Sequence, residues 1–290
     1  MEITRIDNEE EFKYLRTRPS LAWPTVLLEM CSLIAIIWSW HGVLTEQTSI
    51  WFACLVNCIA YYYLFTPAHD GLHRAISKYD NINDFFAYLA IVPISIVSPA
   101  FEYFKMFHMQ HHIKCGDPDL DPDLKISSRW TNAFSLWMVW GIQYYNYYKT
   151  YRDELPTVNV KYAMPRVLVT LAVLGYLWIA LPVEMILLWL IPVMFTVWMT
   201  AFVFSFLPHH VHERVEGEDE MSKYQTTCNR EGYEWLLSPL TQNQNYHLVH
   251  HIYPTVPFYR YRTLWLAGKT KHENEKPAVV PAFSNSLSLR

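Results

Sequence analysis

The sequence predicts an all-α integral membrane protein with four transmembrane helices, a re-entrant or interfacial segment, and a cytoplasmic helical cap that carries a histidine-rich metal site. Two long stretches, 21–68 and 167–207, contain no Lys or Arg. Hydrophobic residues make up 52% of the 290 positions and charged residues only 17%, yet the mean hydropathy is just +0.02. Eleven of the thirteen histidines fall into four short groups. Long apolar spans joined to a polar cap account for these observations.

Each stretch without Lys or Arg divides into two membrane spans. The first divides at 41–49 and the second at 181–184, so the predicted spans are about 22–41, 50–68, 166–181 and 184–206. Segments of this length match a hydrocarbon core of about 30 Å, because a helix rises about 1.5 Å per residue. Glu29 is the awkward charge of the first span, and we expect it to snorkel or to be paired.

The distribution of positive charge predicts the orientation. All 23 Lys and Arg lie in the N-terminus, in the loop from 69 to 166, and after 207. Four crossings place these segments on one side of the membrane, and the positive-inside rule makes that side cytoplasmic. We therefore expect a multi-pass protein of the cell inner membrane with both termini and the active site in the cytoplasm.

The remaining segments complete a single domain, 1–290, whose cytoplasmic cap comprises 69–165 and 207–268. The apolar stretch 85–101 contains Pro93 and Pro99, and a full crossing there would break the charge pattern, so we expect a re-entrant or interfacial segment. The polar tail 269–290 is expected to be disordered. A net charge of −4 without a basic stripe gives no indication of nucleic-acid binding.

The spacing of the histidines predicts metal binding. Residues three or four positions apart share a face of a helix, and the stretches HDGLH (69–73), HMQHH (108–112) and HLVHH (247–251) have this spacing. With one further histidine after the fourth span, the expected ligands number nine: His69, His73, His108, His111, His112, His209, His247, His250 and His251. This number is too large for one ion, so two metals are expected, and imidazole suits iron. His41 and His272 are expected to be ordinary polar residues.

A metal transporter and a structural zinc site are the alternatives to a redox-active metal pair. A transporter would need ligands within its spans, and between their end residues the predicted spans offer only Glu29. The cysteines form no CxxC pair, which argues against a structural zinc site rich in thiolates.

The three histidine groups resemble the HxxxH, HxxHH and HxxHH boxes of the integral-membrane fatty acid desaturase and hydroxylase superfamily, over roughly 67–261. Three stretches are more specifically similar to cyanobacterial-type β-carotene ring hydroxylases: HMQHHIKCGDPDLDPD (108–123), FLPHHVHE (206–213) and NQNYHLVHHIYPTVPFYRY (243–261). Carotene ketolases share the Asp-Pro-Asp and Leu-Pro-His elements. The resemblance implies that the box histidines bind two irons, with His209 as an extra ligand and His212 as a competitor for that role. His210 stands where close relatives would have Arg.

Carboxylates and amides near the boxes are candidates to orient the ligands, because a metal-bound histidine usually donates its other N–H to such a group. These candidates are Asp70, Asp117, Asp119, Asp121 and Asp123. Asn245 is a candidate to hold a metal-bound water. The alternative for the acidic run is a solvated turn.

The resemblance implies an O₂-dependent di-iron enzyme that uses two electrons to hydroxylate a lipid-dissolved substrate, first of all the ring of a carotenoid. Acyl-chain desaturation or hydroxylation and ketolation stay open as alternatives. The chain has no rubredoxin-like cysteine pairs and no recognisable haem module. We therefore expect a separate electron donor, ferredoxin-like or similar, on the cytoplasmic face, and an apolar lipid or carotenoid as the substrate in the bilayer.

Overall fold

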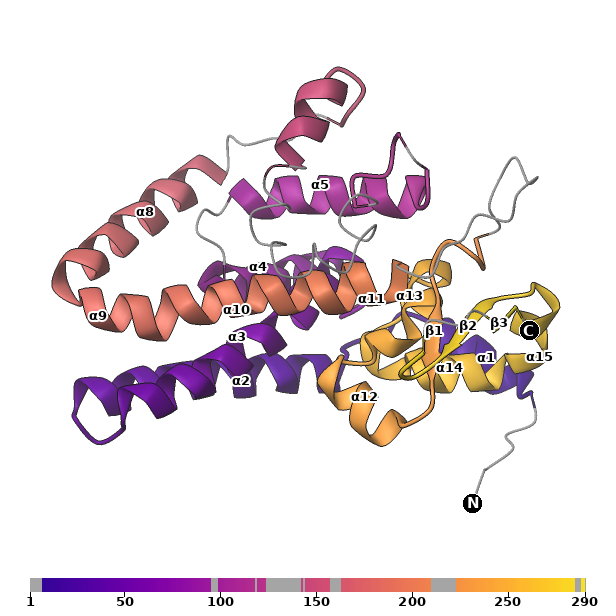
Figure 1. The fold of residues 1–290 in the computed structure, drawn as a ribbon, viewed down its shortest axis with the longest axis horizontal. Coiled ribbons are helices and arrows are strands. Elements are labelled where there is room, and N and C mark those ends of the chain that lie inside the picture. The colour runs from indigo at the N-terminus through magenta and orange to yellow at the C-terminus, as the bar shows by residue number, and fades with distance from the viewer. Residues whose placement is uncertain are drawn as a thin grey trace.

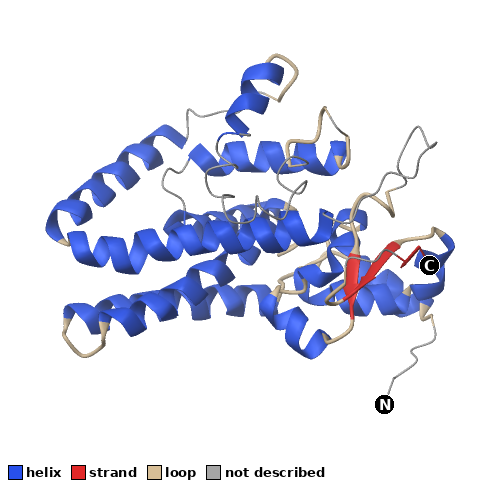
Figure 2. Ribbon diagram, viewed as in Figure 1, coloured by secondary structure: helices blue, strands red, loops and turns tan. Residues whose placement is uncertain are grey.

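The computed structural model of the chain describes residues 7–94, 99–117, 119–123, 142, 144–156, 163–209, 223–284 and 288–289. These residues are mostly helical, with long helices at one end of the molecule and a cap of short helices at the other (Figure 1). A small sheet lies within the cap (Figure 2). The prediction of an all-α fold is therefore wrong in this one respect.

The first two spans form an antiparallel hairpin of α2 (Trp23–Leu44) and α3 (Ile50–Leu72). Two buried hydrogen bonds hold the helices in register. Thr25 Oγ1 donates to Asp70 Oδ2 at 3.0 Å, and Ser39 Oγ donates to Asn57 Oδ1 at 2.5 Å. The second helix continues four residues beyond the predicted end at 68, and it therefore holds the first histidine box on a rigid element.

The last apolar stretch is one continuous helical rod. It comprises α9 (Pro182–Glu184), the π-helical turn η1 (Met185–Leu190), α10 (Ile191–Thr200), the π-helical turn η2 (Ala201–Phe206) and α11 (Leu207–His209). Turns of π-helix are rare and often lie at functional sites, and here one of them leads directly to His209. The preceding helix, α8 (Ala163–Ala180), is linked to α5 by an ion pair of 2.5 Å between Arg166 and Glu102.

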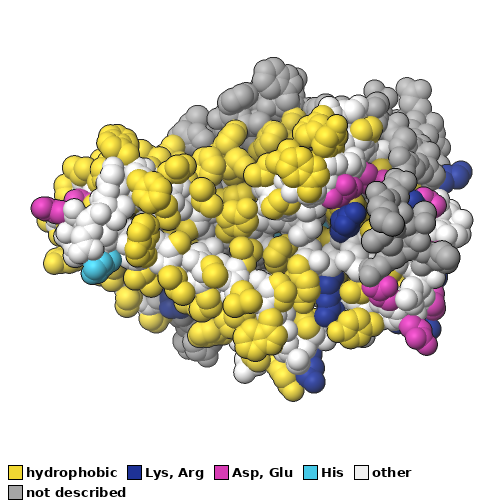
Figure 3. Space-filling model, turned by 90° about the horizontal axis from the view of Figure 1, so that it is seen from below, with side chains coloured by type: hydrophobic (Ala, Val, Ile, Leu, Met, Phe, Trp, Pro, Cys, Tyr) yellow, Lys and Arg dark blue, Asp and Glu magenta, His cyan; other side chains and the backbone are white. Residues whose placement is uncertain are grey.

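Three helices of the described chain are long and apolar enough to cross a membrane: Trp23–Leu44, Ile50–Leu72 and Pro182–His209. The chain is thus an integral membrane protein. A shorter apolar helix covers Met164–Ala180, so the fourth crossing stays a prediction. Hydrophobic side chains cover most of the face in Figure 3, whereas charged side chains gather at the end that bears the cap. Large side chains such as Ile37, Trp51 and Ile179 are exposed on the long helices, as lipid-facing residues would be.

The predicted re-entrant stretch 85–101 comprises most of α4 (Asp80–Ile94) and the start of α5 (Pro99–Lys114), with residues 95–98 outside the described chain. Its depth in a membrane stays a prediction. Helix α4 packs closely on α3 at Gly71, where a Cβ atom would lie 2.7 Å from Ala87 Cβ. Only glycine permits this approach.

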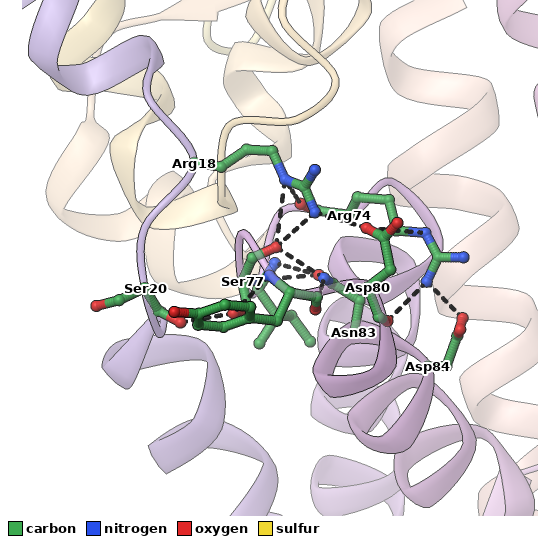
Figure 4. A network of polar contacts seen from close by, with 9 residues as sticks. Arg18, Ser20, Arg74, Ser77, Asp80, Asn83 and Asp84 are labelled. Atoms are coloured by element: carbon green, nitrogen blue, oxygen red, sulfur yellow. Dashed lines mark hydrogen bonds and ion pairs between the residues drawn. The ribbon is translucent and has the colours of Figure 1, made fainter.

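The turn between α3 and α4 is fixed by a polar network (Figure 4). The Arg18 guanidinium donates to the Ser77 carbonyl at 2.7 Å and pairs with Asp80 at 2.9 Å. Asn83 Oδ1 accepts from the backbone N–H of Ser77 at 3.0 Å, and Arg74 pairs with Asp84 at 2.5 Å. Exposed ion pairs contribute little individually, but bonds to backbone groups hold the segment just after His73.

The cap combines the chain start with the segment after 223. Its helices and strands are α1 (Glu9–Arg16), β1 (Asn229–Glu231), α12 (Glu234–Leu240), η3 (Gln244–Tyr246), α13 (His247–Ile252), η4 (Phe258–Arg260), α14 (Tyr261–Ala267), α15 (Lys269–Asn274), β2 (Ala278–Pro281) and β3 (Ser288–Leu289). Strand β1 pairs parallel with β2, which pairs antiparallel with β3. The hydrophobic core of the cap is centred on Tyr246, Leu248, Tyr261, Leu264 and Trp265.

The prediction that the tail 269–290 is disordered is wrong for residues 269–281. Helix α15 and strand β2 occupy this part, because the Ala278–Val279–Val280 stretch is apolar, buried and paired with β1. His272 is fully buried and stacks on Trp265, with ring centroids 4.6 Å apart and planes 4° apart. It packs in the cap core and is not an exposed tail residue.

Candidate metal centre

The histidine boxes lie at the ends of helices that meet where the spans join the cap. His69 and His73 are at the end of α3, and the second box occupies the last turns of α5. The third box forms α13, and His209 ends α11. The structure thus brings together all nine histidines that the sequence singled out.

The first cluster comprises His69, His73, His108 and His250, each with a ring nitrogen within 4.8 Å of the others. His112 belongs beside it, because its Nε2 lies 3.2 Å from His108 Nε2 and 3.0 Å from His250 Nε2. Four of these five side chains are buried, and His112 is half-buried.

The second cluster comprises His111, Cys115, His209 and His251. His247 lies beside it, with its Nε2 atom 3.1 Å from His251 Nε2. Cys115 was not expected here. It lies four residues after His111, directly after the end of α5, and approaches His209 Nδ1 at 3.7 Å, so its i+4 spacing from a box histidine was the signal that could have found it.

The crowding of ring nitrogens indicates a cation. His108 Nε2 lies 3.1 Å from His69 Nε2, 2.8 Å from His73 Nε2 and 3.2 Å from His112 Nε2. A neutral imidazole nitrogen either donates one proton or accepts one, so one atom cannot satisfy three such neighbours. A metal ion that accepts a lone pair from each ring satisfies all of them, and the residues therefore fit bound metal.

Burial keeps most of these rings in the form that binds metal. Desolvation holds the pKa of six of them well below the usual value, and the charges of neighbouring histidines lower it further. These six are His73, His108, His112, His247, His250 and His251. Neutral imidazole is the ligand form. Burial also acts to lower the pKa of His111, but the charge and hydrogen bond of Asp121 outweigh it and raise that pKa to about 9.

Three outer partners fix how the rings point. His111 Nδ1 lies 2.8 Å from Asp121 Oδ1, His247 Nδ1 lies 2.6 Å from Gln244 Oε1, and His250 Nδ1 lies 3.0 Å from the Tyr261 hydroxyl. Each partner occupies Nδ1 and leaves Nε2 for a metal. Asp121 was expected from the sequence, whereas Gln244 and Tyr261 were missed, although both lie within the stretch 243–261 that carries the third box.

The other expected carboxylates and the amide have different contacts. Asp70 accepts from Thr25 and from the backbone N–H of Phe258. Asp117 accepts from two backbone N–H groups of its own turn, Asp123 accepts from Tyr144, and Asp119 is exposed. The side chain of Asn245 contacts Ser238, Thr241 and the Arg230 carbonyl. His210 and His212 lie outside the described residues.

Two adjacent histidine-rich clusters at the cap end of long apolar helices define a class of protein, the membrane oxidoreductases with a histidine-ligated metal pair. The family model for fatty acid desaturases matches residues 14–275, and the chain belongs to the fatty acid desaturase family. A comparison with curated proteins found no match. The two clusters are typical of the di-iron site of this family, so the protein is an O₂-dependent di-iron oxidoreductase.

Proposed function

We propose that the protein hydroxylates the ring of a carotenoid dissolved in the bilayer, with O₂ as co-substrate and two electrons from a separate donor. The iron ligands are the eight histidines of the three boxes and His209 of the Leu-Pro-His element. His212 is the alternative to His209 as the extra ligand. The motifs that support this choice are the Asp-Pro-Asp extension at 117–119, the Leu-Pro-His element at 207–209 and the stretch 243–261. All three resemble β-carotene ring hydroxylases.

The observation that carries the proposal is an apolar cavity lined by Leu207 and Pro208, which directly precede His209, and by Gln244. Its volume is about 320 Å³, and Met199, Phe202 and Val203 of the last span line it together with Leu237 and Leu240 of α12. Pockets for small ligands start at about 300 Å³ and are mostly apolar with a few polar groups. This size suits a compact hydrocarbon ring better than a long chain.

The cavity is linked to the metal centre through one side chain. Gln244 lines the cavity and also contacts His247 Nδ1 at 2.6 Å. Phe283, which is 70% exposed, and Leu240, which is 54% exposed, lie at the rim. An apolar molecule that enters at this rim would come to lie next to Gln244, on the Nδ1 side of His247.

A second, much smaller cavity of about 10 Å³ lies against the first cluster, between His69, His108 and three phenylalanines. Phe65 and Phe204 pack edge to face at 4.8 Å, and Phe104 stacks on His108 at 5.6 Å. A space of about 10–15 Å³ holds one water-sized molecule. These rings exclude bulk water from the centre and leave space for about one water-sized molecule.

Bound irons supply the O₂ chemistry that oxidises an unactivated C–H bond. The chain itself holds the metals, excludes water and positions the reacting carbon. The electrons come from a ferredoxin-like or similar protein on the cytoplasmic face. This arrangement assumes four crossings of the cell inner membrane with both termini in the cytoplasm, as the charge distribution predicts.

Desaturation or hydroxylation of an acyl chain is the second candidate, because the matched family is that of fatty acid desaturases and the histidine boxes are shared. Ketolation of a carotene ring is the third, because ketolases share the Leu-Pro-His element. All three reactions use the same centre: the second differs in the molecule that the apolar cavity accepts, and the third in the ring carbon that is oxidised and in the product.

Expression with a ferredoxin system in cells that make β-carotene separates these candidates. We expect ring-hydroxylated carotenoids, and none from a His108→Ala variant expressed to the same level. Unchanged carotenoids together with newly unsaturated lipids would refute ring hydroxylation in favour of the second candidate. Ring ketones would favour the third.

A further inference from the structure

Glu29 is a buried carboxyl group that the metal centre does not use. It lies in α2 and is 0% exposed, and neither of its oxygens has a hydrogen-bond partner within the described chain. An unpaired buried charge costs several kcal/mol, so a carboxyl group in such a place carries its proton. The sequence led us to expect snorkelling or pairing, and the structure gives Glu29 neither.

The register of the hairpin places Glu29 opposite Thr66. Thr25 contacts Asp70 across the antiparallel pair, and Ser39 contacts Asn57 further along the same face. One turn from Thr25 along α2 leads to Glu29, and one turn back from Asp70 along α3 leads to Thr66. Thr66 is also 0% exposed, and its Oγ1 has no partner among the described residues.

Further buried oxygens without partners in the described chain lie on the same side of the hairpin. One is Asp70 Oδ1, and another is Oε1 of Gln242, whose Nε2 donates to the Tyr62 carbonyl one turn before Thr66. Buried polar groups are nearly always hydrogen-bonded, to protein or to ordered water, and a buried water needs two to four polar partners. This set of oxygens from two helices and the cap offers the polar partners that a buried water requires.

The same polar group borders the first metal cluster. Thr66 precedes His69 by three residues on α3, which is about 4.5 Å along the helix axis. His69 Nδ1 is itself buried without a partner in the part of the chain that the structure describes. A hydrogen-bonded chain from Glu29 over Thr66 would therefore end beside the metal centre.

We propose that Glu29 is a proton donor for oxygen reduction, and that it passes its proton through the Thr66 hydroxyl and buried water toward the di-iron site. Hydroxylation converts R–H, O₂, two electrons and two protons into R–OH and water. Desaturation converts a CH–CH unit, O₂, two electrons and two protons into an alkene and two waters. In both cases the protein donor supplies the electrons, and two protons are consumed. Glu29 gives up one proton, becomes a carboxylate and is protonated again from the cytoplasm. The inference rests on the oxygen-dependent oxidation proposed above, but not on the choice of substrate.

Infrared spectroscopy of the iron-loaded protein tests the protonated state without any substrate. We expect the carbonyl stretch of a protonated carboxyl group, shifted in D₂O, in the wild type and in Ser32→Ala, and its loss in Glu29→Gln. Ser32 lies three residues further along α2, is also buried and donates to the Leu28 carbonyl. The same band in Glu29→Gln, or no band in the wild type, would overturn the proposal even if the protein hydroxylates carotenoids.

Kinetics tests the proton transfer with whichever lipid the protein oxidises. In Glu29→Gln we expect kcat to fall by about 10²-fold, since proton transfer by a positioned group contributes about 10²–10⁴-fold. Iron content and KM stay unchanged, more O₂ is released as peroxide per electron pair, and the solvent isotope effect changes. Thr66→Val, which keeps the shape of the side chain, shows the same pattern to a smaller extent and serves if Glu29→Gln fails to fold. Three results would contradict the proposed proton transfer. They are an unchanged kcat in both variants, an equal fall of kcat in Ser32→Ala, and a lower kcat that is explained by loss of iron.

Discussion

Replacing Asp121 by Asn tests how the second cluster is held. The Asp121 carboxylate is 2% exposed, and the paired His111 ring is 3% exposed. Oδ1 accepts from His111 Nδ1 at 2.8 Å and from the Asp123 N–H at 2.9 Å, while Oδ2 accepts from the Gly116 N–H at 2.9 Å. An amide in the same place presents an NH₂ group to one of these donors in either orientation, so Asp121→Asn loses at least one bond and the charge.

The size of the effect follows from these bonds. A hydrogen bond to a charged group contributes about 1.5–3 kcal/mol, and the loss of an outer partner of a metal ligand lowers metal affinity by about 10–100-fold. We expect Asp121→Asn to release iron to a chelator at about 10–100-fold lower chelator concentration than the wild type. Because the ligand that Asp121 orients is His111 of the second cluster, we expect only the iron of that cluster to be released in this way.

A chelator titration of the purified protein, followed by iron content per chain, measures this effect. Asp119→Asn is the matched control, because Asp119 lies in the same acidic turn but is exposed, and it should titrate like the wild type. Equal titrations of Asp121→Asn and the wild type would refute the role of Asp121. An equal loss in both variants would mean that the charge of the turn matters and the single bond does not.

Three further substitutions have clear expected outcomes. Gly71→Ala brings a Cβ to 2.7 Å from Ala87 Cβ, so overpacking between α3 and α4 should destabilise the fold by about 1–3 kcal/mol; a thermal melt at or above the wild-type Tm would disprove this. Tyr261→Phe removes the hydroxyl 3.0 Å from His250 Nδ1 and should lower iron affinity about tenfold with the melt nearly unchanged; wild-type iron affinity would show that the hydroxyl does not support the ligand. His272→Ala empties the space beside Trp265 and should cost about 2–4 kcal/mol while iron per chain stays the same; iron loss with an unchanged melt would mean that His272 acts at the metal centre.

The three boxes could be found from the sequence because their ligands obey helical spacing. Each box presents imidazoles on one helical face, and the charge distribution placed all the boxes on one side of the bilayer. These two local rules predicted that the eight box histidines lie together, whereas His209 was added from its place after the last span and from the Leu-Pro-His element. Asp121 could also be predicted from the sequence, since it closely follows the second box.

The features that sequence reasoning missed depend on contacts between distant segments. Tyr261 reaches His250 only after the turn at Pro254 and Pro257 brings α14 back onto α13. The tail 269–281 looked polar on average, but its short stretch Ala278–Val280 is buried through pairing with β1, about fifty residues earlier in the chain. Average composition over about twenty residues conceals a short apolar strand.

Anomalous diffraction at the iron absorption edge, from crystals of the purified iron-loaded protein, tests the central claim most directly. We expect two separate iron peaks, one among the ring nitrogens of His69, His73, His108 and His250 and the other beside His111, His209 and His251. A single peak, or no iron at either cluster when the protein retains its activity, would contradict the account.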